Sequence, residues 1–491
     1  MKSKVIKKMF AVLLAASMMT GVAACGNNDS GSGSSSPAGG SQGGSSESAQ
    51  ATPEPTEAPE EDLGAYTIRK DANGNTVDLG GIEIIVNNHS ASSEEEGPAS
   101  AYEEARNEYL DWAQKTYNFT LKQEADSTWA STAEDFANYV TGGGDDHYYI
   151  NVLNSGGELM AAMKNQLLYD VSTLDCFDLT EDKWVKAVSE NCSMNNAVYG
   201  FRTDKDGMLG GRGIYFNKRI LQESGINPDD LYKWQDAGEW TWEKFEELCS
   251  KVEKDDDGDG IMDRKAMACQ NSIWFEVVVY TNGGSFVGQD ANGKYINNLE
   301  SAETMEALNW AWDMWEKYDA HTTYPENAEW NHFESMFPNG QVCFYPAQLW
   351  RAGALTGSMD DEIGFICFPK GPKATDYVNP VTDACYAIPG CYDAEKAWKI
   401  AFAWDVWTEP IPGYEDFVTW RAEALKSFDD TESVDSTVEK LMQCGVPTLT
   451  SLVGINVSED VIWKLNKDNT PAQAAEAVRN SWQSILDTAN Q

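Results

Sequence analysis

The sequence is short of positive charge. Lysine and arginine together number 36 against 79 aspartate and glutamate residues, which gives a formal net charge of −43. A field of this sign repels nucleic acid and anionic lipid headgroups, so we expect neither to be a partner. The acidic residues are dispersed along the chain, which is typical of a solvated surface.

The motifs of common catalytic and metal sites are also missing. The four histidines form no HExxH pair, and there is no CxxC, no Walker phosphate loop and no GxSxG elbow between a strand and a helix. Glycoside hydrolysis needs two carboxylates roughly 5–9.5 Å apart, and no such pair stands out among the acidic residues. We therefore expect a protein that is not an enzyme.

The cysteines indicate no disulfide framework. Ten cysteines include Cys25 and leave an odd number, most of them among apolar neighbours. A free thiol in such surroundings behaves as a small hydrophobe. Cys385 and Cys391 are the one pair that we consider for a disulfide, and free thiols outside the cytoplasm would suit an anaerobic host.

Long apolar runs are missing after the N-terminus, where none approaches the ~18 residues of a membrane-spanning helix. Four lysines in residues 2–8 precede an apolar run at 9–22, which is too short to span a bilayer comfortably. The following VAAC at 22–25 resembles the lipobox of bacterial lipoproteins. The resemblance implies a signal peptide over 1–24 and a lipid such as palmitate on Cys25; the alternative is an ordinary secretory signal with a chance cysteine.

Residues 25–62 are rich in glycine, serine, proline and glutamate. Such a composition cannot bury enough apolar surface to fold, so we expect a disordered, lipid-anchored linker. It would hold the folded part on the extracellular face of the cell membrane. The remaining ~430 residues exceed a single hydrophobic core, which indicates two lobes.

Strands and helices alternate along the folded part. GIEIIV at 81–86 and YYINVL at 148–153 predict buried strands, and each is followed by a helical pattern, at 102–117 and 157–167. This alternation indicates βαβ units, a largely parallel sheet and an α/β fold.

Five groups of motifs follow one another over residues 80–410. They are AVYGF (197–201), GIYFNKRILQESG (213–225) with TWEKF (241–245), TNGGSFV (281–287), FPNGQVCFYPAQLWRAG (337–353), and IGFICFPKGP (363–372) with AEKAWKIAFAW (394–404). Each group is weak alone, but in this order they resemble the extracellular solute-binding proteins of ABC importers, the class that includes maltose-binding protein. Cys343 and Phe344 depart from the family's usual Ala-Met.

The resemblance implies a type II periplasmic-binding-protein-like fold, in which two α/β lobes, each a sheet flanked by helices, are joined by a hinge. The N-terminal lobe would comprise 80–210 plus 360–405, and the C-terminal lobe 211–359 plus 406–491. A ligand would bind between the lobes, which would close over it.

The implied function is capture of a carbohydrate, in particular an oligosaccharide, for delivery to the permease subunits of an ABC transporter by a monomeric cell-surface protein. The 18 tryptophans and 20 tyrosines agree, because aromatic rings offer large apolar contact areas to the C–H faces of sugars. Two alternatives remain: a surface carbohydrate-recognition or adhesin lipoprotein without a transporter, and an importer protein for peptides or another polar solute.

Candidate ligand-binding residues follow from position. The resemblance places a sugar-stacking tryptophan at Trp350, and Asn88 and Asn154 follow predicted strands at the edge where α/β proteins bind ligands. Arg351 would bind a hydroxyl or carboxylate, or form a surface salt bridge. The full set is Trp350, Trp274, Trp129, Trp330, Asn154, Ser155, Asn88, Arg351 and Asp383.

The stretch KDDDGDGIMD at 254–263 resembles a calcium-binding EF-hand loop. Asp255, Asp257, Asp259 and Asp263 occupy positions 1, 3, 5 and 9, and Ile261 at position 7 offers its carbonyl oxygen. The glutamate expected at position 12 is missing. We expect a structural Ca²⁺ site away from the ligand, and a solvated acidic turn is the alternative.

Overall fold

The computed structural model describes residues 66–91, 100–128, 130–154, 157–203, 210–260, 262–381, 384–414 and 417–490. The chain divides into two units, Met1–Gly64 and Ala65–Gln491. The expected signal peptide (1–24), Cys25 and linker (25–62) lie outside the described residues. Among the described helices, none is both long enough and apolar enough to cross a membrane.

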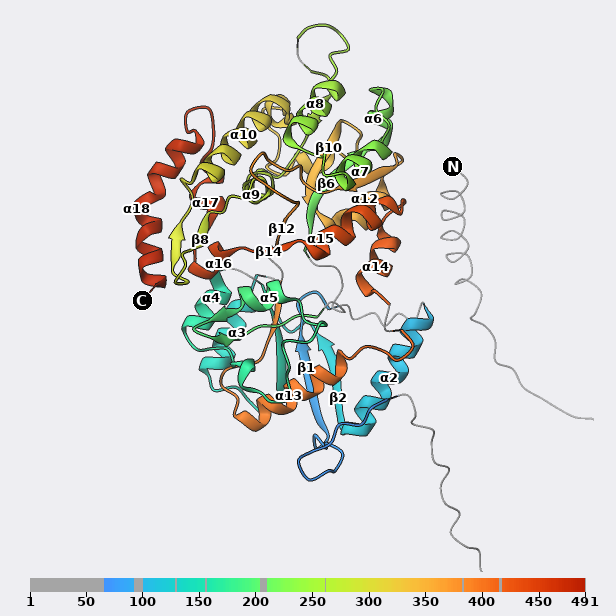
Figure 1. The fold of residues 1–491 in the computed structure, drawn as a ribbon, viewed down its shortest axis with the longest axis vertical. Coiled ribbons are helices and arrows are strands. Elements are labelled where there is room, and N and C mark those ends of the chain that lie inside the picture. Colours follow the sequence, from blue (N-terminus) through green and yellow to red (C-terminus); the bar gives the residue numbers. More distant parts are fainter. Residues whose placement is uncertain are drawn as a thin grey trace, which may run out of the picture. The chain divides into compact units, whose positions relative to one another are not determined.

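The unit Ala65–Gln491 contains two lobes, and the first is built on a sheet in the order β13-β3-β1-β2. The strands β1 (Ile82–Asn87), β2 (Phe119–Glu124) and β3 (Tyr148–Leu153) are parallel, and β13 (Cys385–Ala387) pairs antiparallel with β3. Helices connect the parallel strands in turn (Figure 1), namely α2 (Ala101–Tyr117) and α3 (Thr132–Thr141). The expected βαβ units are confirmed.

Local sequence sets the ends of α2. The Ser100 hydroxyl accepts a hydrogen bond from the backbone N–H of Glu103, and Glu103 and Glu104 lie in the first turn. An oxygen cap and negative charge at a helix N-terminus are both stabilising. At the other end Asn118 has φ 54°, a left-handed conformation that asparagine tolerates better than most residues.

The second lobe is built on a sheet in the order β11-β6-β10-β7. β6 (Arg212–Asn217) pairs antiparallel with β10 (Val342–Gln348) and with β11 (Ile363–Ile366), and β7 (Lys265–Met267) pairs parallel with β10. A continuous core of buried aromatic and aliphatic side chains joins this sheet to its helices. The longer of these helices are α8 (Trp242–Val252), α9 (Asn271–Thr281), α10 (Ala302–Tyr318) and α18 (Pro471–Ala489).

Shorter elements complete both lobes. Those of the first lobe are α4 (Gly157–Lys164), η1 (Val171–Thr173), α5 (Lys186–Asn191), β4 (Ser193–Met194), β5 (Ala197–Val198) and α13 (Ala394–Trp407). The others are α6 (Lys218–Glu223), α7 (Asp229–Asp236), β8 (Val287–Gln289), β9 (Tyr295–Asn297), η2 (Ala320–Thr323), α11 (Phe333–Met336), η3 (Leu349–Arg351), α12 (Ala352–Ser358), β12 (Asn379–Val381), α14 (Thr419–Ser427), η4 (Ser433–Val438), α15 (Glu439–Gln443), β14 (Gly445–Pro447), α16 (Leu449–Val453), α17 (Val457–Asp460) and η5 (Ile462–Lys464).

The lobe boundaries differ from the predicted ones. Residues 363–366 were assigned to the first lobe, but β11 pairs with β6 in the second, with Ile363 opposite Asn217. The chain crosses back between β11 and β13. It also stays longer in the first lobe than residue 405, because Ile411 and Tyr414 pack in that core, whereas Trp420 packs in the other. Which sheet accepts a strand depends on register, which a linear motif order does not contain.

A buried ion-pair network ties the residues before β1 to the first lobe. Asp405 of α13 is 3% exposed and pairs with Lys183 at 2.7 Å and with Arg69, while Glu409 pairs with the same two cations. Oxygens of Glu181, Asp405 and Glu409 lie close enough together to suggest a metal cluster. The positive charges of Arg69 and Lys183 already balance these carboxylates, so we assign the cluster a structural role and not a metal-binding one.

Candidate ligand-binding site

In each sheet, one edge lies where the chain passes to the other lobe. β13 enters the first sheet with Cys385 opposite Leu153, the last residue of β3. β6 enters the second sheet with Arg212 opposite Gln348, the last residue of β10. The chain therefore crosses between the lobes at the carboxyl ends of β3 and β10, and the segments after these strands border the space between the lobes. Ligands of open α/β sheets bind at such an edge.

Amide and hydroxyl side chains gather at this edge of the first lobe. Asn87, at the end of β1, lies opposite Asn151 of β3. Its Nδ2 donates to Oδ1 of Asn151 at 3.4 Å, and the Ser127 hydroxyl donates to Oδ1 of Asn87 at 3.4 Å. Asn151 is only 5% exposed, yet its Nδ2 finds no hydrogen-bond partner within the described part of the chain. A buried unpaired donor costs about 1–3 kcal/mol, so an acceptor supplied at this edge would be stabilising.

Large aromatic side chains are exposed on the second lobe. Among the described tryptophans, Trp330, Trp350 and Trp463 stand out with exposed fractions of 79%, 65% and 57%. Trp330 and Trp463 line one cavity of about 210 Å³. Its other lining residues are Cys269, Gln270, Asn271, Trp315, His321, Tyr324 and Phe333. Exposed aromatic rings around a concavity are typical of a binding site.

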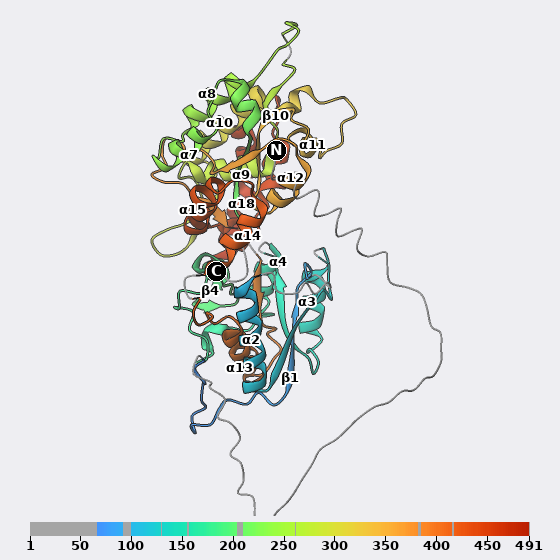
Figure 2. The same ribbon diagram turned by 90° about the vertical axis from the view of Figure 1, so that its right-hand side faces the viewer.

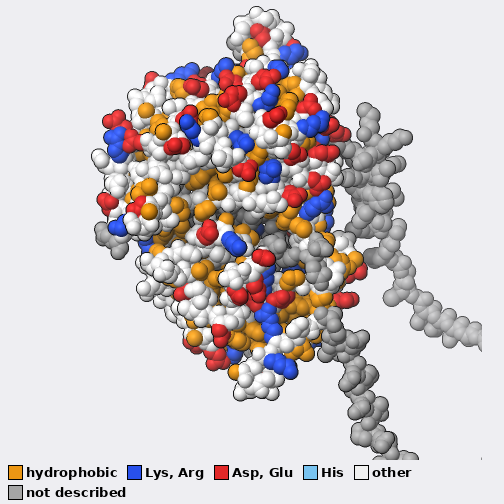
Figure 3. Space-filling view, in the orientation of Figure 1, with side chains coloured by type: hydrophobic (Ala, Val, Ile, Leu, Met, Phe, Trp, Pro, Cys, Tyr) orange, Lys and Arg blue, Asp and Glu red, His pale blue; other side chains and the backbone are white. Residues whose placement is uncertain are grey.

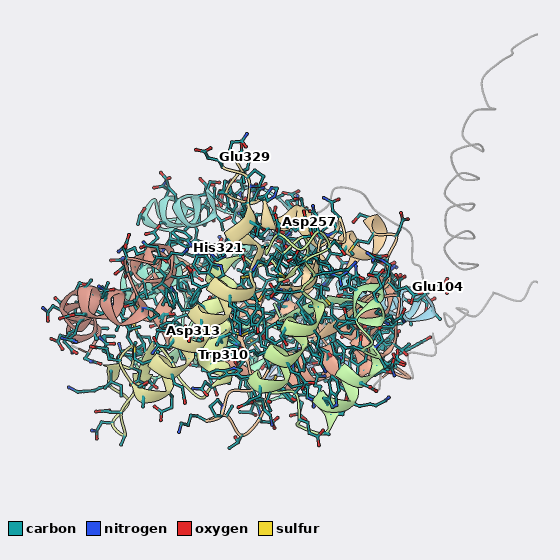
Figure 4. All side chains as sticks on the ribbon, turned by 90° about the horizontal axis from the view of Figure 1, so that it is seen from above. Glu104, Asp257, Trp310, Asp313, His321 and Glu329 are labelled. Atoms are coloured by element: carbon teal, nitrogen blue, oxygen red, sulfur yellow. The ribbon has the colours of Figure 1, made fainter. Side chains whose placement is uncertain are left out.

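Contacts between side chains position the wall of this aromatic cavity. The His321 ring stacks on Trp315 with centroids 3.7 Å apart and an interplanar angle of 10°, and His321 Nδ1 lies 3.1 Å from the fully buried Asp319. Burial raises the pKa of Tyr324 well above its usual value, so its phenol stays protonated. Figure 4 looks down on this lobe and shows His321, with Glu329, the neighbour of Trp330, projecting at the edge.

Trp350 and Trp330 lie on segments that an ion pair joins. Arg351 donates to Glu334 at 2.6 Å and to Gln348 at 3.0 Å, and its guanidinium lies 4.8 Å from the Trp350 ring centroid. Glu334 belongs to α11, which follows the loop that carries Trp330. Of the two roles considered for Arg351, the structure shows the salt bridge, which braces the exposed Trp350 ring.

Trp274 is a core residue, and the prediction that it contacts ligand is wrong. Its side chain is fully buried, its Nε1 donates to the Ala311 carbonyl at 2.9 Å, and its ring lies 5.6 Å from that of Trp310. Both neighbours belong to α10, which α9 packs against. No face of the Trp274 ring is accessible to a ligand, because the packed helices α9 and α10 cover it.

The remaining candidates divide between two positions. Asn88 continues the β1–β2 ladder through its backbone, and its Nδ2 donates to Gln123 at 3.3 Å, which puts it beside the polar edge. Asn154 is half-buried at the mouth of a separate, mostly apolar cavity of about 350 Å³ between α3 and α4. Trp129, Ser155 and Asp383 lie outside the described residues.

The sequence did not predict several residues of the site, namely Asn87, Ser127, Asn151, Tyr324 and Trp463. Trp463 carried a usable signal, because the stretch KLNKDN that follows it is mostly charged and polar. Asn87 and Asn151 carried none, since 64 residues separate them and only the parallel register brings them together.

The acidic loop after α8 lies apart from this site and projects beyond the second lobe (Figure 1). Carboxylate oxygens of Asp255, Asp257 and Asp263 all lie within 4.8 Å of one another, and Asp259 is not among them. Asp255 accepts hydrogen bonds from the backbone N–H groups of Gly258 and Gly260 at 2.7 and 3.0 Å. Ile261 lies outside the described residues.

Acidic and basic side chains are interspersed over the face in Figure 3, in keeping with the expected dispersed acidic surface.

Figure 2 shows α3 of the first lobe and α11 of the second on one side, and β4 and α15 on the opposite side.

The chain matches the family described as bacterial extracellular solute-binding protein over residues 144–421. The arabinooligosaccharide-binding protein of Bacillus subtilis (strain 168) is 23% identical over 262 residues, which are 49% of this chain and 57% of that relative. The match thus spans little more than half the length of the relative.

Solved structures of other proteins share the fold, and two of them illustrate the similarity. UgpB from Mycobacterium tuberculosis in complex with glycerophosphocholine is 16% identical, with a TM-score of 0.57 over 83% of this chain and 99% of that chain. The cyclic alpha-maltosyl-1,6-maltose binding protein from Arthrobacter globiformis is 13% identical, with a TM-score of 0.58 over the same shares. These similarities confirm the expected two-lobe, type II binding-protein fold.

Proposed function

We propose that this chain, which belongs to the family of bacterial extracellular solute-binding proteins, captures an oligosaccharide between its lobes and delivers it to an ABC transporter permease. The observation that carries the proposal is that one lobe exposes tryptophans, while the other has a polar, amide-rich strand edge. The family membership also confirms that the protein is a binding protein and not an enzyme.

The chemistry of the two edges is complementary to a sugar. A pyranose or furanose ring has apolar C–H faces, which suit the exposed faces of Trp330, Trp350 and Trp463, and ring hydroxyls, which suit amides such as Asn151. Stacking alone does not distinguish sugars, whereas buried amides that must be paired reject ligands without matching hydroxyls. We assign affinity to the tryptophans and selectivity to the amides.

Three features favour an oligosaccharide over a single sugar. Trp350 lies outside the cavity that Trp330 and Trp463 line, so the aromatic surface extends beyond one pocket. The cavity of about 210 Å³ has room for about one sugar unit, so a ligand that also reached Trp350 would be longer than one unit. The matched relative from Bacillus subtilis carries the name of an arabinooligosaccharide-binding protein.

The cellular setting belongs to the same proposal. We expect a monomer held to the outer face of the cell membrane by a lipid on Cys25, because of the lipobox-like VAAC and the linker that follows it. Metabolic labelling with a palmitate analogue tests this anchor, and a Cys25→Ser chain should lose the label and pass into the medium. Label retained in the variant would refute the anchor.

A structural Ca²⁺ ion in the loop after α8 is a further part of the proposal. Three carboxylates converge there, and hard oxygen donors are what Ca²⁺ prefers. Calcium should raise the melting temperature of the purified chain, and the effect should disappear in Asp257→Asn but persist in Asp256→Asn, whose side chain pairs with Lys254 instead. Equal calcium responses of the two variants would contradict the site.

Titration calorimetry against a panel of ligands tests the carbohydrate assignment. The panel contains arabinose- and glucose-based oligosaccharides of two to six units, the matching monosaccharides, peptides and glycerophosphocholine. We expect micromolar binding of at least one oligosaccharide and a higher melting temperature in its presence. Binding of peptides or glycerophosphocholine, with no response to any sugar, would refute the assignment.

Transport is separated from surface adhesion by a second experiment. Deletion of the gene for this chain should abolish uptake of the oligosaccharide that the calorimetry identifies, and the Trp330→Ala chain should restore it only in part. Unchanged uptake in the deletion strain, with binding intact, would favour a carbohydrate-recognition protein that serves no transporter.

A further inference from the structure

Two buried thiols meet inside the first lobe. Cys192 follows α5 and is 1% exposed, and Cys385 begins β13 and is fully buried. A Cβ atom placed on Gly200 would lie 2.8 Å from the sulfur of each. Both sulfur atoms therefore lie close to the position that a Cβ atom of residue 200 would occupy, and glycine leaves this position empty.

The backbone around this point holds the two thiols in place. The Tyr199 N–H donates to the Cys192 carbonyl at 2.9 Å, and Phe201 and Tyr386 exchange two backbone hydrogen bonds of 3.0 and 2.9 Å. Residues 199–201 thus link the end of α5 to β13. A hydrogen bond with the Cys385 thiol, together with burial, raises the pKa of Cys192 well above its usual value.

Two other pairs of described cysteines lie near enough to influence each other, Cys249 with Cys343 and Cys367 with Cys444, but a thiol–thiol hydrogen bond is found only between Cys192 and Cys385 in the described part of the chain. All nine described cysteines are free thiols, and the Cys391 sulfur lies instead against Gly144, 3.0 Å from where its Cβ would be. The neighbour of Cys385 is therefore Cys192 and not Cys391, although Cys391 is the closer in sequence.

In the sequence, the two cysteines lie on either side of the segment that forms the sheet of the second lobe. Cys192 precedes β6, Cys385 follows β11, and the whole four-stranded sheet of the second lobe is built between them. A covalent bond between them would tie together the outgoing and returning chain beneath the edge that faces the ligand, where Cys385 pairs with Leu153.

We infer that Cys192 and Cys385 are a modification site, at which a peroxide oxidises the two thiols to a reversible disulfide. One sulfur attacks the peroxide O–O bond, so that an S–O bond forms and water leaves. The second sulfur then displaces the sulfenic oxygen as a second water, and the S–S bond forms. Two thiols and one hydrogen peroxide thus give one disulfide and two waters. The inference is independent of the proposed ligand.

Burial and the raised pKa both make the reaction slow at neutral pH. Peroxide reaches the pair only during local opening of the lobe, and only the thiolate attacks. Because the pKa of Cys192 is raised, the thiolate fraction remains small at pH 7, and we expect the oxidation to accelerate as the pH rises toward 9.

Peptide mapping of the full chain tests the inference. The reduced protein is treated with hydrogen peroxide, its remaining thiols are alkylated, and the linked peptides are identified by mass spectrometry without reduction. We expect one dominant link, between the peptides that carry Cys192 and Cys385. Peroxide-treated wild type in which these cysteines stay reduced, become sulfinic acids or link to others would overturn it, and this measurement requires no variant.

Variants and melting curves add a second readout. Cys385→Ala should abolish the link, whereas Cys391→Ala, the matched control, should leave it intact. The disulfide closes a long loop, so oxidation should raise the melting temperature by roughly 5 °C, and a thiol reductant should reverse the rise. A rise of the same size in oxidised Cys385→Ala would contradict the assignment.

Discussion

Replacement of Trp330 by alanine is the sharpest test of the binding site. The Trp330 side chain is 79% exposed and lines the aromatic cavity beside Trp463. A ligand that stacks on one face of the ring would cover about half of a side-chain area of ~200 Å², which is ~100 Å². At ~25 cal/mol per Å² this contributes about 2.5 kcal/mol, of which we expect about 2 kcal/mol to be lost in the variant. The dissociation constant should therefore rise about thirtyfold.

Because Trp330 is exposed, its replacement should change ligand affinity with little change in stability. A side chain that contacts little of its own protein contributes little to folding, so Trp330→Ala should melt within about 1–2 °C of the wild type. Trp330→Phe, which keeps a smaller ring, should lose only part of the affinity. Calorimetry with the identified oligosaccharide measures both effects.

Two results would refute this reasoning. An unchanged dissociation constant in Trp330→Ala would mean that the exposed tryptophans do not face the ligand. A similar loss in Trp398→Phe would mean that affinity responds to any change of tryptophan, since Trp398 lies on α13, where its Nε1 donates to Asp175 at 2.7 Å, and has no place at the ligand edge.

Three further predictions concern single residues of the fold and site. Asn151→Leu removes a buried, unpaired donor but also the acceptor of the Asn87 Nδ2 hydrogen bond. The two effects oppose each other, so the melting temperature should change little, while calorimetry shows at least a tenfold loss of ligand affinity; unchanged affinity would exclude this residue from the site. Gly200→Ala places a methyl group 2.8 Å from two sulfurs, and urea titration should show a loss of about 1–3 kcal/mol in unfolding free energy. The control Gly357→Ala, with no atom within 4 Å of the new Cβ, should be neutral or slightly stabilising, and equal effects of the two would contradict the crowding argument. Asp405→Asn removes the buried partner of Lys183, so urea titration should show a loss of about 3–5 kcal/mol; a loss below about 1 kcal/mol would show that Glu409 alone satisfies the cations.

The fold was largely predictable because its signals are local. Apolar runs followed by helical periodicity predicted β1 and β3 and the helices after them, and parallel βαβ units follow from that alternation. The lobe boundary at β11 was not predictable, because IGFI could pair with either sheet. Its place beside β6 depends on backbone hydrogen bonds to residues about 150 positions earlier in the chain.

The candidate site was predictable only in part. Trp330 and Trp274 are the same residue type at similar distances from glycine-containing turns, yet one is 79% exposed and the other fully buried. The difference is set by whether a second helix covers the ring, as α10 covers Trp274. The amides at the opposite edge meet only through strand register.

The sequence by itself determined the chemistry available to this protein: an excess of negative charge, many aromatic rings, an acidic loop with calcium-like spacing and an order of motifs that indicates two lobes. These properties depend on residue types and short spacings. Tertiary structure alone decided which tryptophans remain exposed, which amides meet at the edge between the lobes, and that Cys385 lies against Cys192 and not Cys391. Such contacts join residues far apart in the chain, and only packing and strand register bring them together.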